Sequence, residues 1–176
     1  QMCIRDRQRR LIHLVTDQIY EKEKNNRMMT GILSQIVEFR NGESGLHVLH
    51  INILTQLLLE KLMRKSENYD LSWSQQHMIA TASALHDIGK IGIDEKILNK
   101  PGKLTKEEFE AMKQHTIIGA RMLDSLEMYH DEEMMKYAYE ICRWHHERYD
   151  GKGYPDGLKG EEIPISAQVV SLADVY

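Results

Sequence analysis

Two short runs of the sequence bring histidine together with carboxylate side chains. The run from 145 to 155 begins with two adjacent histidines and ends in Gly-Tyr-Pro, and the run from 86 to 90 begins with a His-Asp pair and ends in lysine. Imidazole and carboxylate groups are common protein ligands of divalent metal ions that prefer nitrogen and oxygen. The two runs therefore predict a site for a divalent metal.

Further candidate ligands lie at other places in the chain. Glu43 and His47 are four residues apart, so both can share one face of a helix. His115 lies in a predicted helix, and Asp174 lies among apolar residues near the last position. A single helical histidine is more often a surface or hydrogen-bonded residue, and we interpret four others in that way: His13, His50, His77 and His130.

The spacing of apolar residues predicts helices almost throughout. It favours one long or broken helix over residues 11–39 and another over 46–62, separated by the breaker Asn41-Gly42. Ser72 and Thr105 each open a capping box, which predicts helices that begin directly after them. Two more helices are expected at about 131–146 and 167–176. Because strand-like alternation is nearly absent, we predict an all-α fold.

Composition limits the classes of protein that fit. The 176 residues carry 23 Lys and Arg against 27 Asp and Glu, a net charge of −4, which gives no reason to expect binding to duplex nucleic acid. No apolar stretch approaches the roughly 20 residues of a membrane span. The two cysteines, Cys3 and Cys142, are far apart and lack metal-site or redox spacing. We therefore expect a cytoplasmic, reducing location.

The sequence resembles the HD-GYP phosphohydrolases, a subgroup of the HD superfamily, from about residue 39 to the last residue. The motifs that carry this resemblance are HDIGK at 86–90, KPGKLTKEE at 100–108, MKQH at 112–115, HHERYDGKGYP at 145–155 and ADV at 173–175. Residue by residue, the resemblance implies eight metal ligands: Glu43, His47, His86, Asp87, His115, His145, His146 and Asp174.

The resemblance also implies a helical bundle with two divalent metal ions, or three when Glu43 joins. Nitrogen and oxygen ligands without thiolate favour iron or manganese over a structural zinc. A carboxylate such as Asp87 can bridge two metals about 4 Å apart, which lower the pKa of a water and stabilise charge on a phosphate oxygen. We expect Asp87 to be catalytic for this reason.

Contacts to the substrate are expected from two places in these motifs. Lys90 offers a cation to a phosphate, so we predict a catalytic and substrate-binding role for it. In the Gly-Tyr-Pro turn, Gly153 permits an unusual backbone angle, Tyr154 can stack or hydrogen-bond, and Pro155 stiffens the exit. We also expect a pair between Arg148 and Asp150, and core positions for Trp73 and Trp144.

The resemblance implies a phosphodiesterase that hydrolyses cyclic di-GMP to linear pGpG, and onward to GMP. Two alternatives stay open: hydrolysis of another cyclic dinucleotide or a nucleotide, and a non-catalytic signalling or partner-binding module. We interpret residues 1–40 as a connector helix from a sensor or receiver domain and residues 41–176 as the catalytic domain, incomplete at its C-terminus. A homodimer is a further expectation.

Overall fold

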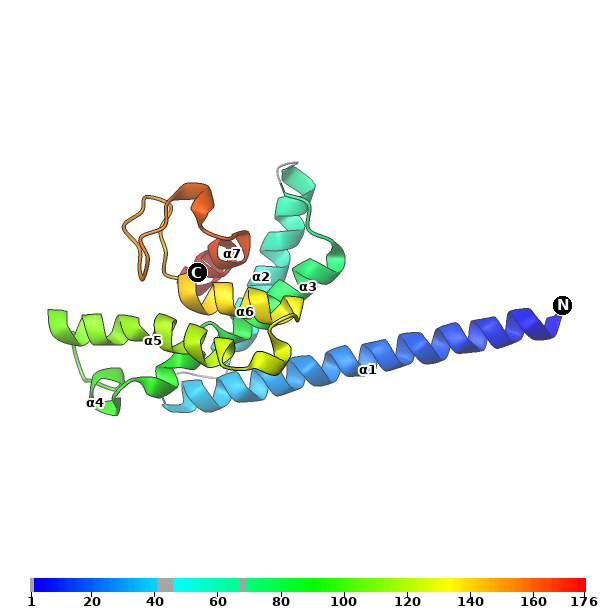
Figure 1. Ribbon diagram of the computed structural model, residues 1–176, viewed down its shortest axis with the longest axis horizontal. Coiled ribbons are helices and arrows are strands. Elements are labelled where there is room, and N and C mark those ends of the chain that lie inside the picture. Colours follow the sequence, from blue (N-terminus) through cyan, green and yellow to red (C-terminus); the bar gives the residue numbers. More distant parts are fainter. Residues whose placement is uncertain (1, 41–45, 67–68) are drawn as a thin grey trace.

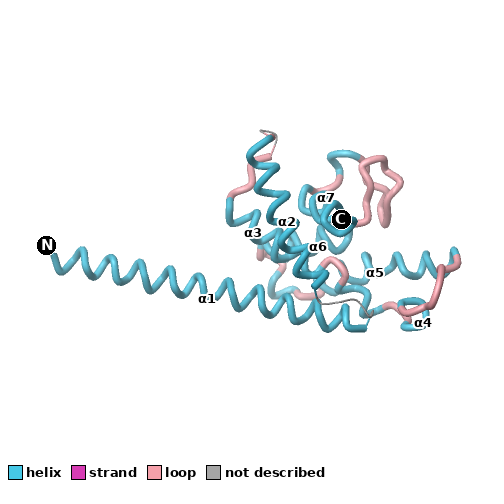
Figure 2. The backbone as a smooth tube through the Cα atoms, turned by 180° about the vertical axis from the view of Figure 1, so that it is seen from behind, coloured by secondary structure: helices cyan, strands magenta, loops and turns pink. Residues whose placement is uncertain are grey.

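The computed structural model describes residues 2–40, 46–66 and 69–176 of the chain. Within these ranges every regular element is a helix, and no strand is present, as Figure 2 shows. The all-α prediction is thereby confirmed. The α-helices are α1 (Met2–Arg40), α2 (Leu46–Lys65), α3 (Trp73–Ala82), α4 (Glu95–Leu98), α5 (Lys106–Asp124), α6 (Glu133–Trp144) and α7 (Ile165–Val175). Short 3₁₀ helices are η1 (Ser83–Leu85), η2 (Ile88–Gly92), η3 (Glu127–Tyr129) and η4 (Gly160–Glu162).

The first helix, α1, is continuous, which decides between the one long and the broken helix that the sequence allowed. Its N-terminal part extends away from the rest of the chain, and its C-terminal part lies along the other helices (Figure 1). Between residues 6 and 29 every side chain except Glu23 is exposed. Contacts with the helical domain begin near Glu23, and Arg27 donates a hydrogen bond to His77 of α3.

The domain core lies where α2, α3, α5, α6 and α7 meet. Its most completely buried apolar side chains include Leu59, Ile79, Ile141 and Val170, each from a different helix. Such a core fixes the helices relative to one another, because each buried apolar side chain adds about 1.5–3 kcal/mol to the free energy of unfolding. Among the described residues, none of the helices is both long enough and apolar enough to cross a membrane.

Both predicted capping boxes are present. The Ser72 side chain accepts a hydrogen bond from the Gln75 backbone, and the Gln75 side chain accepts one from the Ser72 backbone; Thr105 and Glu108 do the same before α5. Each box satisfies two backbone N–H groups that have no partner within the helix. The starting points of α3 and α5 are therefore fixed locally, and with them the positions of His86 and His115.

The close approach of η2 to α5 depends on two glycines. A Cβ atom at Gly89 would lie 1.9 Å from the carbonyl oxygen of His115 and 2.4 Å from the backbone nitrogen of Gly119. A side chain at Gly119 would in turn meet the Gly89 backbone at 3.1 Å. Only glycine allows the two backbones to pack at this distance, and this packing brings the segment after His86-Asp87 against the helix that carries His115.

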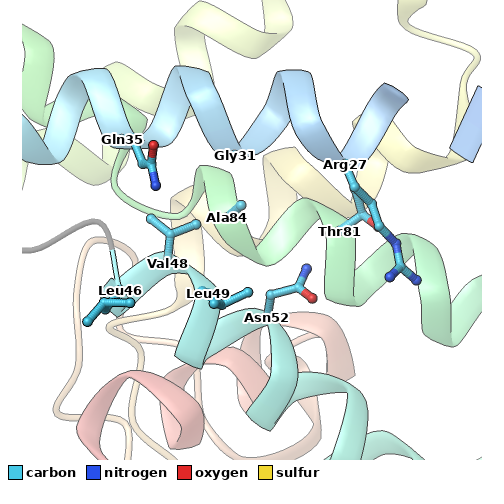
Figure 3. Close-up of a pocket in the computed structure, with 9 residues that line it drawn as sticks. All are labelled: Arg27, Gly31, Gln35, Leu46, Val48, Leu49, Asn52, Thr81 and Ala84. Atoms are coloured by element: carbon cyan, nitrogen blue, oxygen red, sulfur yellow. The ribbon is translucent and has the colours of Figure 1, made fainter. Parts of the chain in front are cut away.

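The end of α1 is attached to the domain by small and polar side chains. The Ser34 hydroxyl donates a hydrogen bond to the Ala84 carbonyl oxygen, and Arg40 donates one to the Ile91 carbonyl oxygen. Beside these contacts α1 and α2 enclose an open cavity of about 510 Å³. Figure 3 shows Arg27 and Gln35 extending from α1 on the side that faces this cavity.

We expect Gly89→Ala to lower the free energy of unfolding by at least about 3 kcal/mol, because its Cβ would overlap backbone atoms that cannot move independently. Urea unfolding followed by circular dichroism in the presence of a chelator would measure this without a contribution from metal binding. Gly31→Ala is the matched control, since a Cβ there meets nothing within 4 Å and alanine suits a helix interior better by about 0.5–1 kcal/mol. Equal stabilities of the two variants would contradict the close packing.

Candidate metal centre

The structure brings seven of the eight predicted ligands to one place inside the helical domain. They come from α2, from the segment between η1 and η2, from α5, from the end of α6 and from α7: His47, His86, Asp87, His115, His145, His146 and Asp174. The eighth, Glu43, lies outside the described residues. The other four histidines do not belong to either ligand group found among the described residues.

The side chains form two groups with metal-ligand geometry. In the first group, a nitrogen atom of each of His115, His145 and His146 lies within 4.8 Å of the others. In the second group, ligand atoms of His47, His86 and Asp174 are within the same distance of one another. Three ligand atoms at such spacing can surround one ion, so each group is a candidate position for a metal.

Asp87 lies between these two groups. Its Oδ1 atom is 3.3 Å from Nε2 of His115 and 3.9 Å from Nε2 of His145, both in the first group. Its Oδ2 atom is 3.1 Å from Nε2 of His86, in the second group. One oxygen therefore faces each group, which is the arrangement a bridging carboxylate needs.

The backbone orients three of the histidine rings. Nδ1 of His86 is 2.9 Å from the Ser83 carbonyl oxygen, Nδ1 of His115 is 2.7 Å from that of Met112, and Nδ1 of His145 is 2.9 Å from that of Ile141. A carbonyl oxygen only accepts, so each Nδ1 must carry the proton and donate it. Each Nε2 then points into the centre, and in a neutral ring it has a lone pair available for a metal.

The burial of the centre tests whether these residues fit a metal. His86, His115 and His145 are almost completely buried, and Asp87 is 7% exposed. Nevertheless Nε2 of His86 and Oδ1 of Asp87 make no hydrogen bond. A buried polar atom without a partner is costly, and coordination of an ion would satisfy both atoms. The donor set and its unsatisfied atoms therefore fit divalent metals.

The charges of the second group are strongly coupled. Burial alone would lower the pKa of His86, but the Asp87 and Asp174 carboxylates outweigh it and raise that pKa to about 9. Burial alone would raise the pKa of Asp87, whereas His86, Lys90 and His145 hold it well below its usual range. The carboxylate is thus ionised, and without metal a protonated imidazole stands beside it.

The histidines of the first group are held neutral. Burial, together with the positive charge of His86, lowers the pKa of His145 to about 3. Burial also lowers the pKa of His146 to about 2, and that of His115 falls for the same reason. Neutral imidazoles can bind a metal without first losing a proton.

Lys90 contacts the bridging carboxylate directly. Its Nζ atom is 2.8 Å from Oδ2 of Asp87, and its side chain is 16% exposed. The structure therefore places this cation at the edge of the centre, next to the oxygen that faces the second group. A role in substrate binding stays a prediction.

The loop after the two histidines is tied down by Glu147, a residue that the sequence interpretation missed. Its Oε1 atom accepts hydrogen bonds from the backbone N–H groups of Asp156, at 2.7 Å, and Gly157, at 2.9 Å. The side chain is 3% exposed. Its place directly after His146 was the only signal in the sequence, because the backbone partners are identifiable only once the loop has folded back.

The Gly-Tyr-Pro turn closes one side of the centre. The Tyr154 ring stacks on His146 with centroids 4.8 Å apart, and Pro155 follows it through a cis peptide bond. Gly153 is required for a reason other than the predicted one: it has no positive φ, but a Cβ would lie 2.3 Å from the Arg148 backbone nitrogen. The predicted pair of Arg148 and Asp150 is confirmed at 2.9 and 3.1 Å.

The tryptophans differ from the prediction in part. Trp73 is 65% exposed and stacks on His77, so its assignment to the core is wrong. Trp73 is the first residue of α3, directly after the capping residue Ser72. Trp144 is half-buried, and its indole N–H donates to Asp156 in the loop that Glu147 holds. It has a structural role rather than a position in the apolar core.

The HD domain family matches residues 20–176, which is most of the chain. The chain therefore belongs to the HD domain family, and its motifs and relatives identify it as a protein of the HD-GYP type. The match begins inside α1, so the second half of that helix is covered together with the helices that hold the metal centre.

Three relatives illustrate the similarity. A "Probable cyclic di-GMP phosphodiesterase" of Vibrio cholerae is 38% identical over 93% of this chain and 38% of its own length. A "Cyclic di-GMP phosphodiesterase" of Thermotoga maritima is 44% identical over 82% of this chain and 36% of its own length. The "3'3'-cGAMP-specific phosphodiesterase 2" of Vibrio cholerae is 38% identical over 82% of this chain and 26% of its own length. The chain thus spans well under half the length of these relatives.

We expect the metal-free protein to be most stable near pH 6.5. Below that pH the unfolded chain binds protons at His145 and His146, whereas the folded chain keeps both neutral, so stability is lost as the pH falls. Above it the folded chain retains a proton on His86 up to about pH 9 that the unfolded chain has released, so stability is lost as the pH rises. Urea unfolding in chelator between pH 5 and 9 would measure both slopes.

Variants separate the contributions to the acid slope. Each group that stays neutral contributes about 1.4 kcal/mol per pH unit, so His146→Gln should reduce the slope between pH 5 and 6 by about that amount. His13→Gln is the control variant, because His13 lies on the exposed part of α1 and not among the buried histidines of the centre. A stability that does not vary between pH 5 and 6.5 would contradict the neutral, buried state of these histidines.

Proposed function

We propose that the chain is the catalytic part of a metal-dependent phosphodiesterase that hydrolyses cyclic di-GMP to linear pGpG, and onward to GMP. The observation that supports this most directly is the position of Asp87, which directs one oxygen to each of two ligand groups. Paired metals bridged by a carboxylate are a recurrent arrangement for hydrolysis of phosphate esters.

The ligand groups suggest how two ions would be held. His115, His145 and His146 with Oδ1 of Asp87 would hold one, and a second set would hold the other, namely His47, His86 and Asp174 with Oδ2 of Asp87. Glu43 would add one more ligand, and with this ligand the motif implies a third ion. Nitrogen and oxygen donors without thiolate favour iron or manganese. When bound, such ions supply a water of lowered pKa and charge stabilisation at phosphate oxygens.

The chain's own side chains would act around this chemistry. Lys90 holds Asp87 ionised from the edge of the centre, and the same ammonium group can reach a phosphate that approaches there. The neutral histidines add no negative charge to a centre that must accept an anion. Tyr154, together with Gly153 and Pro155, forms the wall against His146 that would contact the substrate.

The choice of substrate depends on the relatives. Cyclic di-GMP is named for relatives of Vibrio cholerae and Thermotoga maritima, whereas 3'3'-cGAMP is named for a third that is 38% identical. The second candidate function is therefore hydrolysis of 3'3'-cGAMP. A non-catalytic module is less favoured, since all seven described ligands converge. We place the activity in the cytoplasm, where a sensor or receiver domain of the full-length protein would regulate it. Cys142 is a buried free thiol, which fits a reducing compartment.

Asp87→Asn should lower hydrolysis of cyclic di-GMP by at least about 100-fold and reduce bound metal from two or more ions per chain to one or none, because the amide offers only one weak donor where a bridge is needed. The reaction would be followed by chromatography of pGpG and GMP after anaerobic reconstitution with iron or manganese. Elemental analysis would give the metal content. His13→Ala should keep activity within about two-fold.

The same assay with 3'3'-cGAMP distinguishes the two candidate substrates. Faster hydrolysis of 3'3'-cGAMP would overturn the assignment to cyclic di-GMP but retain the reaction. A folded protein that binds two metals and hydrolyses neither compound would overturn the proposed function. Unchanged turnover in Asp87→Asn would show that the bridging assignment is wrong.

A further inference from the structure

The Glu147 side chain, directly after the two adjacent histidines, has one buried oxygen atom without a partner. Only 3% of the side chain is exposed, and Oε1 accepts the backbone N–H groups of Asp156 and Gly157. Oε2 is buried too, and within the described ranges of the chain no donor reaches it. An unpaired buried acceptor is costly, and more so when its group is charged. The position therefore suits a donor that these residues do not supply.

The negative charge of this carboxylate also lacks a counterion. No ion pair between described residues includes Glu147, and the adjacent guanidinium of Arg148 is already paired with Asp150 at 2.9 and 3.1 Å. The two backbone N–H groups at Oε1 are neutral donors. A water molecule at Oε2 would supply the missing hydrogen bond but no charge, whereas a cation supplies both. The surroundings of Glu147 therefore favour a cation over water.

Glu147 lines an open cavity between its own loop and α7. The cavity has a volume of about 520 Å³, which is within the range of small-molecule sites. The Gln168 side chain also lines it, and because its N–H donates to the Ile163 carbonyl oxygen at 2.8 Å, its own oxygen can accept from a ligand. The Ser171 hydroxyl and the apolar Leu172 side chain belong to the same lining. The cavity thus offers several acceptors together with apolar surface.

This lining suits an organic cation better than a metal ion. Neither of the two ligand groups found among the described residues includes Glu147, so a metal here would lack a set of protein ligands. A guanidinium group presents several N–H donors in one plane, and its aliphatic stem packs on apolar surface, whereas an ammonium group is a compact point charge. We propose that the cavity binds a guanidinium group on a short aliphatic stem, which donates to Oε2 of Glu147.

A cation in this cavity acts on the loop that closes the metal centre. The carboxylate that binds it is the one that holds the backbone of Asp156 and Gly157. Those residues directly follow Tyr154 and Pro155, and the Tyr154 ring stacks on His146 at 4.8 Å. Binding therefore stabilises the loop through its existing anchor, without contact to a metal ligand.

Titration followed by two-dimensional NMR of the chain in chelator tests the site. We expect N-acetyl-L-argininamide to shift the amide resonances of Asp156 and Gly157 and to saturate at millimolar concentration, because the acceptor of both N–H groups becomes polarised. N-acetyl-L-citrullinamide has the same shape without the charge, and it should bind at least about tenfold more weakly. No saturable shift, or equal affinity for the two probes, would overturn the proposal.

Variants assign the binding to Glu147. Glu147→Gln keeps an oxygen for the two backbone N–H groups but replaces Oε2 by a donor, so it should weaken binding of the arginine probe at least about tenfold. Glu107→Gln is the matched control, since this carboxylate is exposed on α5, and it should leave the affinity within about twofold. Equal effects of the two variants would contradict the assignment.

The comparison of the two probes uses the unmodified chain, so it decides the question even if Glu147→Gln does not fold. Circular dichroism of each variant would report its fold. The proposal is independent of the proposed function, because neither experiment measures activity.

Discussion

The ionised carboxylate of Asp87, buried inside the helical domain, is the constraint on which the arrangement of the other elements depends. A buried carboxylate is tolerated only when opposite charge and hydrogen-bond donors surround it. Here the segment from the end of η1 into η2 supplies His86 and Lys90, α5 supplies His115, and the residue after α6 is His145. Three separate parts of the chain must therefore converge on one side chain. The apolar core holds them there, because the same helices contribute to it.

Convergence requires backbones to come closer than side chains normally allow. Gly89 follows the ligand pair by two residues, and Gly119 follows His115 by one turn, so the contact between the glycines sets the distance between two ligand segments. The capping box at Thr105 adds to this, since it fixes where α5 begins and thus which residues face inward. Backbone packing therefore sets the geometry of the centre, because it determines where the residues that carry the ligands lie.

The sequence predicted features whose causes are local. Helix starts followed from Ser72 and Thr105, because a capping box lies within four residues. The ligands followed from motifs, and the structure brings all those it describes together. Features that depend on tertiary contact were not predictable: the Glu147 hydrogen bonds to a loop that folds back, the contact between two distant glycines, and the exposure of Trp73. Glu43 lies outside the described residues, so its place stays a prediction.

The hydrogen bonds from imidazole nitrogens to nearby carbonyl oxygens have a consequence for how ions enter the centre. Each of His86, His115 and His145 is anchored to a residue three or four positions earlier in the chain, so its ring direction is set within its own turn. A side chain already held in one rotamer has little conformational entropy left to lose on coordination. The centre is therefore preorganised. A cation that arrives meets lone pairs of His115 and His145 already aimed at it, whereas His86 must first release its proton. The free energy of coordination is then available for holding the ion rather than for ordering its ligands.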